Sequence, residues 1–423
     1  MRLRFDSLLA GLLYSLLMLS PGNNAVAQTG QCGVERKVTG RALDELTWKQ
    51  LNRVYEEVGE EKYDSAYDDL QNMLRRAGRD EYMQAVLFQA LAQVEWSRRN
   101  YDQSLTWFER AVELDVLPDQ THFALMYQIA QLYSLKERYD DALAALDLWF
   151  CKVPPEQITS HAYVLQASIN SQKEDYAAAL KAIDQAIAMD EDPRENWYQL
   201  KLAAHFELGQ FPEAARTLEL MIGRWPDKKT YWTQLAQIYY KIGQEPKSLA
   251  TMALAYRKGM LDKQSDILYL SSLYSNADVP FKAAEVLEKG IRDGIVEPGK
   301  SHWTMVAETW YSAEELARSL AAFEEAGKAA VDGDIDLRRG FILVDMENWQ
   351  QALEARNTAL DKGGLNERRT GEAYLLRGMA QFNLDNLDAA SADWGRASRY
   401  EDTRDAARQW MNHLREERLR RAS

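Results

Sequence analysis

Small and large apolar residues return along this chain in a pattern that repeats about every 34–38 residues. Two well-formed copies are Tyr176, Ala179, Ile183 and Ala186, and then Leu387, Ala390, Trp394 and Ala397. Steps of three and four residues place each set on one face of a helix. A repeat of this length predicts an array of short helical units, each of which packs only against its neighbours.

Each repeat contains two helical stretches joined by a short polar turn. In the second unit the sequence predicts one helix over residues 81–98 and another over residues 103–114, with Asn100, Tyr101 and Asp102 between them. Ala92 stands in the middle of the first stretch. Small residues at such positions allow two helices to cross closely, and bulky residues fill the space beside them.

Alignment of the repeats gives ten units, each with two key positions twelve residues apart. The position in the second helix is occupied by Ala66, Ser104, Ala142, Ala179, Ala214, Ser248, Ala283, Ser319, Ala352 and Ala390. The position in the first helix is occupied by Val54, Ala92, Ala130, Ala167, Leu202, Ala236, Ser271, Ala307, Gly340 and Gly378. The first set is entirely small, and eight of the second ten are small, which favours a close crossing in nearly every unit.

These units resemble the tetratricopeptide repeat, whose two antiparallel helices carry small residues at the eighth and twentieth positions. The resemblance implies an all-α fold, namely a right-handed α-solenoid of about ten helix–turn–helix units. A final helix within residues 401–423 has Ala406, Ala407, Trp410, Met411 and Leu414 on one face and is expected to cap the array. Its basic end, from Arg415 to Arg421, is either a solvating surface or a contact for acidic partners.

The first 27 residues differ from the rest of the chain. Arg2 and Arg4 precede an apolar run from Leu8 to Leu19, and Ala25-Val26-Ala27 gives a cleavage pattern. This arrangement predicts a secretory signal peptide over 1–27. We therefore divide the chain into that peptide, a segment 28–43, the repeat array 44–400, and the capping helix with its basic tail over 401–423.

Two cysteines, Cys32 and Cys151, remain after the predicted cleavage. An even number of cysteines in an exported protein favours a disulfide bond. Closing so long a loop would stabilise the fold by about 4–5 kcal/mol in the chain-entropy model. The alternative is a pair of free thiols.

Composition and motifs argue against enzymatic chemistry. The formal net charge of -14 disfavours nucleic acid and anionic membranes as partners, although solubility alone explains it. The five histidines are scattered, no phosphate-binding or nucleophile motif occurs, and two cysteines cannot form a cysteine-rich zinc site. Asp332, Asp334 and Asp336 resemble a calcium loop only in part, because Leu343 replaces the glutamate it needs. We expect no cofactor, no metal, no small-molecule substrate and no catalytic residue.

A solenoid usually binds on its concave side, which the first helix of each unit lines. The outward positions there carry amides, hydroxyls and aromatic rings with little charge. They are Tyr127, Gln131, Gln199, Phe206, Thr233, Gln237, Tyr240, Ser272 and Tyr311. Such a groove suits an extended, uncharged peptide or a partner helix, whereas the basic residues for a carboxylate clamp are absent.

Toward the end of the array the same positions become apolar. They carry Leu337, Phe341, Val344, Leu375, Met379 and Phe382. This apolar stripe is either a second docking surface or is covered by the chain itself, since an open apolar patch is a liability.

Several inter-repeat segments go beyond the generic repeat. They are Trp225-Pro226-Asp227-Lys228, the run from Asp278 to Ala284, the run from Leu360 to Leu365, and Ala407-Arg408-Gln409-Trp410. In this order they are similar to exported tetratricopeptide proteins encoded beside TonB–ExbB–ExbD systems of Gram-negative bacteria, a subset of which carries both cysteines. The resemblance implies a periplasmic scaffold that binds a protein or peptide, such as the periplasmic part of that complex. Alternatives are an envelope or outer-membrane assembly factor and a solenoid attached to a cell-wall enzyme.

Overall fold

The computed structural model describes residue 38 and residues 41–422. The predicted signal peptide, Cys32 and nearly all of segment 28–43 therefore lie outside the described residues. The described chain is all-α, with 21 α-helices, two short 3-10 helices and no strand, which confirms the predicted fold class. None of these helices is long and apolar enough to cross a membrane.

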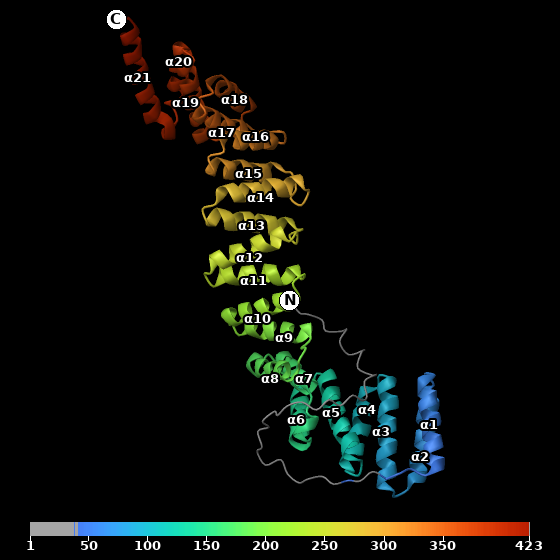
Figure 1. Ribbon diagram of the computed structural model, residues 1–423. Coiled ribbons are helices and arrows are strands. Elements are labelled where there is room, and N and C mark those ends of the chain that lie inside the picture. Colours follow the sequence, from blue (N-terminus) through green and yellow to red (C-terminus); the bar gives the residue numbers. More distant parts are fainter. Residues whose placement is uncertain (1–37, 39–40, 423) are drawn as a thin grey trace. The chain divides into compact units, whose positions relative to one another are not determined.

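The helices divide between two compact units, one made of the described residues up to Gln210 and the other beginning at Phe211, and each unit is described by itself (Figure 1). The first unit contains α1 (Glu45–Gly59), α2 (Tyr63–Ala77), α3 (Glu81–Ser97), α4 (Tyr101–Glu113), α5 (Asp119–Leu135), α6 (Tyr139–Lys152), η1 (Pro155–Gln157), α7 (Ser160–Gln172), α8 (Tyr176–Met189) and α9 (Glu195–Glu207). Helices that follow one another in the chain contact one another, as expected for a repeat array.

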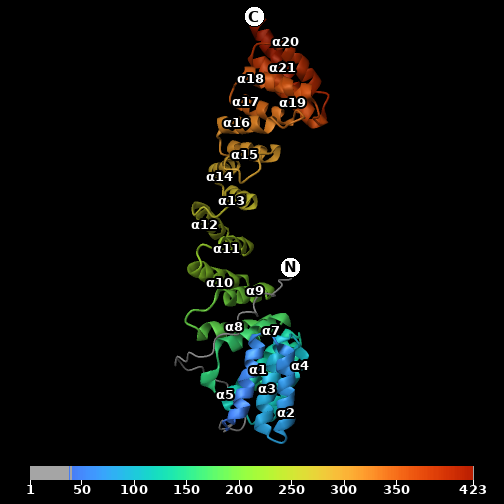
Figure 2. The same ribbon diagram turned by 90° about the vertical axis from the view of Figure 1, so that its right-hand side faces the viewer.

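The second unit follows the same plan. It contains α10 (Phe211–Arg224), α11 (Lys229–Lys241), α12 (Glu245–Arg257), α13 (Gln264–Asn276), α14 (Pro280–Arg292), α15 (Lys300–Ser312), α16 (Leu316–Gly327), α17 (Asp334–Asp345), α18 (Trp349–Lys362), α19 (Glu367–Asn383), α20 (Leu387–Ala397), η2 (Glu401–Thr403) and α21 (Arg404–Ala422). Figure 2 shows α11 to α15 following one another in chain order.

Within each unit, the paired small positions lie where the two helices of a pair cross. All ten residues at the second-helix position are fully buried, and those at the first-helix position are also buried. Three hydroxyl groups bridge the crossing: Ser104 Oγ donates to the Ala92 carbonyl at 2.8 Å, Ser271 Oγ to Ala283 at 3.0 Å, and Ser319 Oγ to Ala307 at 2.7 Å. A buried hydroxyl needs such a partner, so serine replaces alanine here without an unpaired polar group.

The turn inside each helix pair has the same backbone conformation. In all ten turns one residue has a positive φ, and only Gly209 and Gly243 are glycines. The next residue donates its N–H to a carbonyl five residues back, as in Gln244 to Tyr239 at 2.7 Å and Glu315 to Trp310 at 3.0 Å. This bond satisfies a carbonyl at the end of the first helix and fixes the reversal of the chain.

Ion pairs join successive helix pairs of the first unit along one edge. Arg98 pairs with Asp64, Lys136 with Asp102, and Lys173 with Asp140, each across one repeat length. Each aspartate is the second residue of α2, α4 or α6, the second helix of its pair. Each cation lies directly after the first helix of the following pair, which is α3, α5 or α7. The aspartates are exposed, so each pair contributes little on its own, roughly 0.2–1 kcal/mol.

The predicted capping helix is present as α21, and aromatic rings attach it to the array. Trp410 stacks on the fully buried Trp394 of α20 with ring centroids 5.3 Å apart, and Phe382 of α19 lies beside both. Leu375 and Met379 pack against the same cluster. The end of the apolar stripe is thus covered by the chain itself.

Much of the basic tail is also paired within the chain. Arg418 binds Asp388 and Arg421 binds Asp385, both on the α19–α20 side. Hydrogen bonds from Arg420 and Arg421 lower the pKa of Glu417 to about 2. These pairs support the interpretation of the tail as a solvating cap.

The start of the apolar stripe covers a buried cation. Arg356 of α18 is fully buried, and its guanidinium carbon lies 4.3 Å from the centre of the Phe341 ring. Its three nitrogens have no hydrogen-bond partner among the residues that the structure describes. Burial lowers the pKa of this guanidinium to about 9, while nearby Glu372 acts to raise it. Gly340 makes room for it, because a Cβ there would lie 2.5 Å from Arg356 Nε.

Replacing Gly378 by alanine tests the close crossing. The new Cβ would lie 2.5 Å from Nε1 of Trp394, which is fully buried and donates to the Leu375 carbonyl. We expect Gly378→Ala to lower the free energy of unfolding by about 1–3 kcal/mol in urea denaturation. The control is Gly395→Ala in α20, where nothing lies within 4 Å of the new methyl group. If Gly378→Ala and Gly395→Ala changed the free energy of unfolding equally, the close crossing of α19 and α20 at Gly378 would be contradicted.

Replacing Arg356 by methionine tests the unpaired cation. Removing a buried charge without a partner should raise the free energy of unfolding by about 1–4 kcal/mol. Arg377→Met is the matched control, because Arg377 holds the buried Asp393 by two hydrogen bonds of 2.6 and 2.7 Å. Its loss leaves that carboxylate poorly paired and should destabilise by about 3 kcal/mol. If Arg356→Met destabilised the protein as Arg377→Met does, in both thermal and urea unfolding, Arg356 would have a partner and its description as an unpaired cation would be wrong.

Candidate protein-binding face

The candidate binding residues lie on the first helices of the pairs, and we call the exposed side of these helices the first-helix face. Tyr127, Gln131 and Gln199 belong to the first unit, on α5 and α9. Thr233, Gln237 and Tyr240 belong to the second unit, on α11. The six residues therefore form two groups.

In the first unit the group is partly closed. Tyr127 is half-buried, its ring centroid lies 5.3 Å from that of Trp149, and its hydroxyl donates to the His161 carbonyl at 3.3 Å. Burial raises the pKa of this hydroxyl to about 12. Gln131 is half-buried, whereas Gln199 and Phe206 are exposed one above the other on α9. Tyr127 therefore links α5 to α7, the first helices of two successive pairs. Only part of its ring is left exposed to a partner.

In the second unit the group is more open. Gln237 is exposed, and Tyr240 is 43% exposed with its ring edge against Tyr269 on α13. Thr233 is half-buried, and its hydroxyl donates to the Thr230 carbonyl of its own helix at 3.1 Å. Gln237 and Tyr240 are therefore the groups of α11 that face a partner.

Two further candidates continue this face along the second unit. Ser272 of α13 is exposed and donates to the Tyr269 carbonyl at 2.8 Å. Tyr311 of α15 is 46% exposed and donates to Asp345 of α17 at 2.8 Å. The aromatic hydroxyl is thus fixed at a defined place on the surface.

A groove of about 490 Å³ lies on this face between α15 and α17. It is lined by Lys300, Ser301, Thr304, Met305, Glu308, Asp334 and Ile335. Five of these are charged or carry a hydroxyl, and Met305 is an exposed apolar group. The volume lies within the range of ordinary ligand pockets.

Each charged side chain that lines the groove is paired with a neighbouring side chain of opposite charge. Lys300 Nζ lies 3.2 Å from Asp332 Oδ2, and Arg338 Nε lies 2.8 Å from Asp334 Oδ2 and also pairs with Glu308. Hydrogen bonds from the Asp334 N–H and from Lys300 lower the pKa of Asp332. Because each cation already holds a carboxylate, this is a charge-balanced groove and not an open carboxylate clamp.

These charged residues are not among the predicted binding residues, which are uncharged. The sequence does contain a pattern that indicates this groove, because Lys300 and Asp334 stand one repeat length apart at the starts of successive first helices. The prediction that the outward positions of the first helices carry little charge therefore holds for α11 and α13 but not for α15 and α17. Within the described part of the chain, no group of His, Cys, Asp and Glu side chains is arranged to hold a metal ion.

The predicted disulfide has only one end in the described chain. Cys151 is half-buried near the end of α6, and Cys32 lies outside the described residues. The disulfide bond between Cys32 and Cys151 stays a prediction.

Comparison with known families identifies the repeat type. Residues 160–193 match one tetratricopeptide repeat model, and residues 203–262 match another. The first match begins at the first residue of α7, in the register deduced from Ala167 and Ala179. These two segments are therefore tetratricopeptide repeats, and repeats of this type mediate protein–protein interaction. No curated protein matches the sequence.

Solved structures with similar folds include several tetratricopeptide proteins. A tetratricopeptide repeat protein from Parabacteroides merdae is 13% identical, with a TM-score of 0.38 over 68% of this chain and 94% of that one. YrrB, described as having an unusual peptide-binding site, is 14% identical, with a TM-score of 0.37 over 47% of this chain and 94% of that one. The TPR2AB domain of yeast Sti1, solved as a complex with pHSP90, is 14% identical, with a TM-score of 0.31 over 60% of this chain and 96% of that one.

Proposed function

We propose that this protein is a non-enzymatic scaffold that binds a protein partner through the first-helix face of its second unit. One observation carries the proposal: exposed Gln237, Tyr240 and Tyr311 lead along this face to the groove between α15 and α17. Helix backbone groups are satisfied internally, so a partner must be held by side chains. Amide and hydroxyl groups on this face are suited to that task.

An extended peptide is the partner segment that suits this surface. Such a segment exposes its own backbone N–H and C=O groups, which the Gln237 amide and tyrosine hydroxyls can satisfy. Exposed Met305 offers an adaptable apolar contact within the groove. Because the cations of the groove are already paired, a free terminal carboxylate is a poorer ligand.

We place the mature protein in the periplasm. The proposal rests on the basic start, the apolar run Leu8–Leu19 and the pattern Ala25-Val26-Ala27. The partner we propose is the periplasmic part of a TonB–ExbB–ExbD complex, so the protein would assist nutrient uptake. The choice of this partner rests on the inter-repeat segments, which resemble those of proteins encoded beside such systems. An envelope or outer-membrane assembly factor is the alternative.

Crosslinking in cells tests the partner. Tagged protein from cells grown under nutrient limitation should capture TonB, ExbB or ExbD. Capture of outer-membrane assembly proteins instead would contradict the TonB assignment and support the alternative. Failure to find the mature chain in a periplasmic fraction would contradict both.

Alanine substitution tests the face. Replacing Gln237 and Tyr240 together should weaken capture about tenfold, because exposed aromatic and amide contacts of this kind carry much of a small interface. Gln351→Ala is the control, since Gln351 is exposed on α18, a second helix of the same unit. Circular dichroism should show equal helix content in all variants. Equal capture by the double variant and the wild type would exclude this face.

A further inference from the structure

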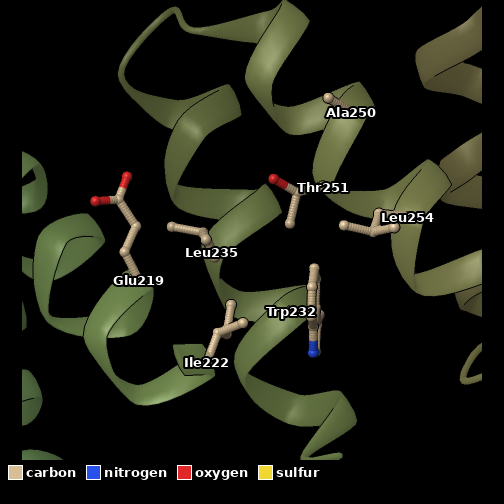
Figure 3. A pocket seen from close by; sticks show the side chains of 7 residues that line it. All are labelled: Glu219, Ile222, Trp232, Leu235, Ala250, Thr251 and Leu254. Atoms are coloured by element: carbon tan, nitrogen blue, oxygen red, sulfur yellow. The ribbon is translucent and has the colours of Figure 1, made fainter. Parts of the chain in front are cut away.

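A second, smaller cavity lies on the opposite kind of surface, the one formed by second helices. Its volume is about 290 Å³, and it is lined by Glu219 and Ile222 of α10, Trp232 and Leu235 of α11, and Ala250, Thr251 and Leu254 of α12. Figure 3 shows α10 and α12 on its two sides, with α11 between them. We call it the α10–α12 notch. It lies at the small end of ligand pockets and fits a side-chain anchor.

The notch is apolar because its polar atoms are already engaged. Trp232 Nε1 donates to the Pro226 carbonyl at 2.9 Å, so the indole offers only its ring. Thr251 Oγ1 donates to the Lys247 carbonyl at 2.7 Å, so this residue offers its methyl group. Leu254 is 38% exposed at the edge. A partner would therefore meet hydrocarbon across most of the surface.

Glu219 is the one ionisable residue that lines the notch. It is exposed on α10, and its Oε1 accepts a hydrogen bond from the Tyr239 hydroxyl. A carboxylate beside an apolar surface attracts a cation more strongly than one surrounded by water. The matching occupant is apolar with a positive charge at one end.

The next repeat shows that this apolar surface is not a general feature of the second helices. On α14, one repeat later, Glu285 and Lys289 stand where α12 has Ala250 and Leu254. These charged groups solvate the surface there. The α10–α12 notch therefore departs from the polar outer surface that a solenoid needs for solubility alone.

The backbone of the occupant is constrained by the helical walls. The notch is made of helix side chains, and it has no sheet edge whose N–H and C=O groups could pair with an incoming strand. An extended segment would leave its own backbone groups unpaired against hydrocarbon, whereas a helix satisfies them internally. Aliphatic and basic residues three or four apart lie on one face of such a helix.

We propose that the α10–α12 notch docks a basic amphipathic helix of a partner protein, with an aliphatic side chain in the notch and a lysine or arginine against Glu219. This surface is separate from the first-helix face, so the two can be engaged at once and tested independently. The net charge of -14 assists the encounter with a basic helix.

Fluorescence anisotropy with two labelled synthetic helices tests the proposal, one built from leucine and lysine and the other from leucine and glutamate. The lysine helix should bind the mature protein, and the glutamate helix should bind at least about tenfold more weakly. Ala250→Trp fills the notch from an exposed position and should weaken the lysine helix about tenfold. Glu219→Gln keeps the shape and should weaken binding and reduce its salt dependence.

Leu148→Ser is the matched control, because Leu148 is 50% exposed at the equivalent repeat position on α6, outside the notch. It should leave affinity unchanged. If Ala250→Trp and Leu148→Ser have equal effects, the lysine helix binds through general charge attraction and the proposal fails. Leu254→Ser is a second variant that shortens the notch wall, so the test does not depend on tolerance of tryptophan. Equal binding of the two synthetic helices would also overturn the proposal.

Discussion

The close crossing of two helices at a pair of small, buried residues is the constraint on which the rest of this structure depends. All ten second-helix positions are fully buried, and the hydroxyls of Ser104, Ser271 and Ser319 bond across the crossing. A larger side chain there would push the helices apart and disturb the packing of each neighbour. Where glycine occupies the first-helix position, the space goes to a large partner, Trp394 beside Gly378 and Arg356 beside Gly340.

Because the crossing uses only inward positions, the outward positions of both helices are free to carry function. The second unit uses them in two ways. Its first helices present polar groups around Gln237 and the groove at Glu308, whereas its second helices present the apolar α10–α12 notch beside Glu219. The first surface suits an extended segment with an exposed backbone, and the second suits a helix with internal hydrogen bonds. A scaffold with two such surfaces can hold two partners together.

The sequence predicts the features that repeat and misses those that depend on three-dimensional neighbours. Spacing alone located the helix pairs, the buried positions and the capping helix. It gave no sign that Glu314 or Asp385 adopts a positive φ, because the Schellman-type turn imposes that conformation on whichever residue follows the helix. It left the apolar stripe open to two interpretations, and the structure closes its end with Phe382 and Trp410. Lys300 pairs with Asp332, just before α17, and Arg338 of α17 pairs with Glu308 of α15. These partners lie about one repeat apart in the sequence, so no pattern within a single helix reveals the pairs.

Site-specific photo-crosslinking in the periplasm tests most directly the claim that the first-helix face binds a protein partner. A photoreactive residue would replace Gln237 or Tyr311 on that face and, as a reference, exposed Arg408 on the capping helix. The account predicts that positions 237 and 311 give adducts with the same partner and that position 408 gives none. Adducts only at position 408, or a captured partner that neither face position reaches, would contradict it.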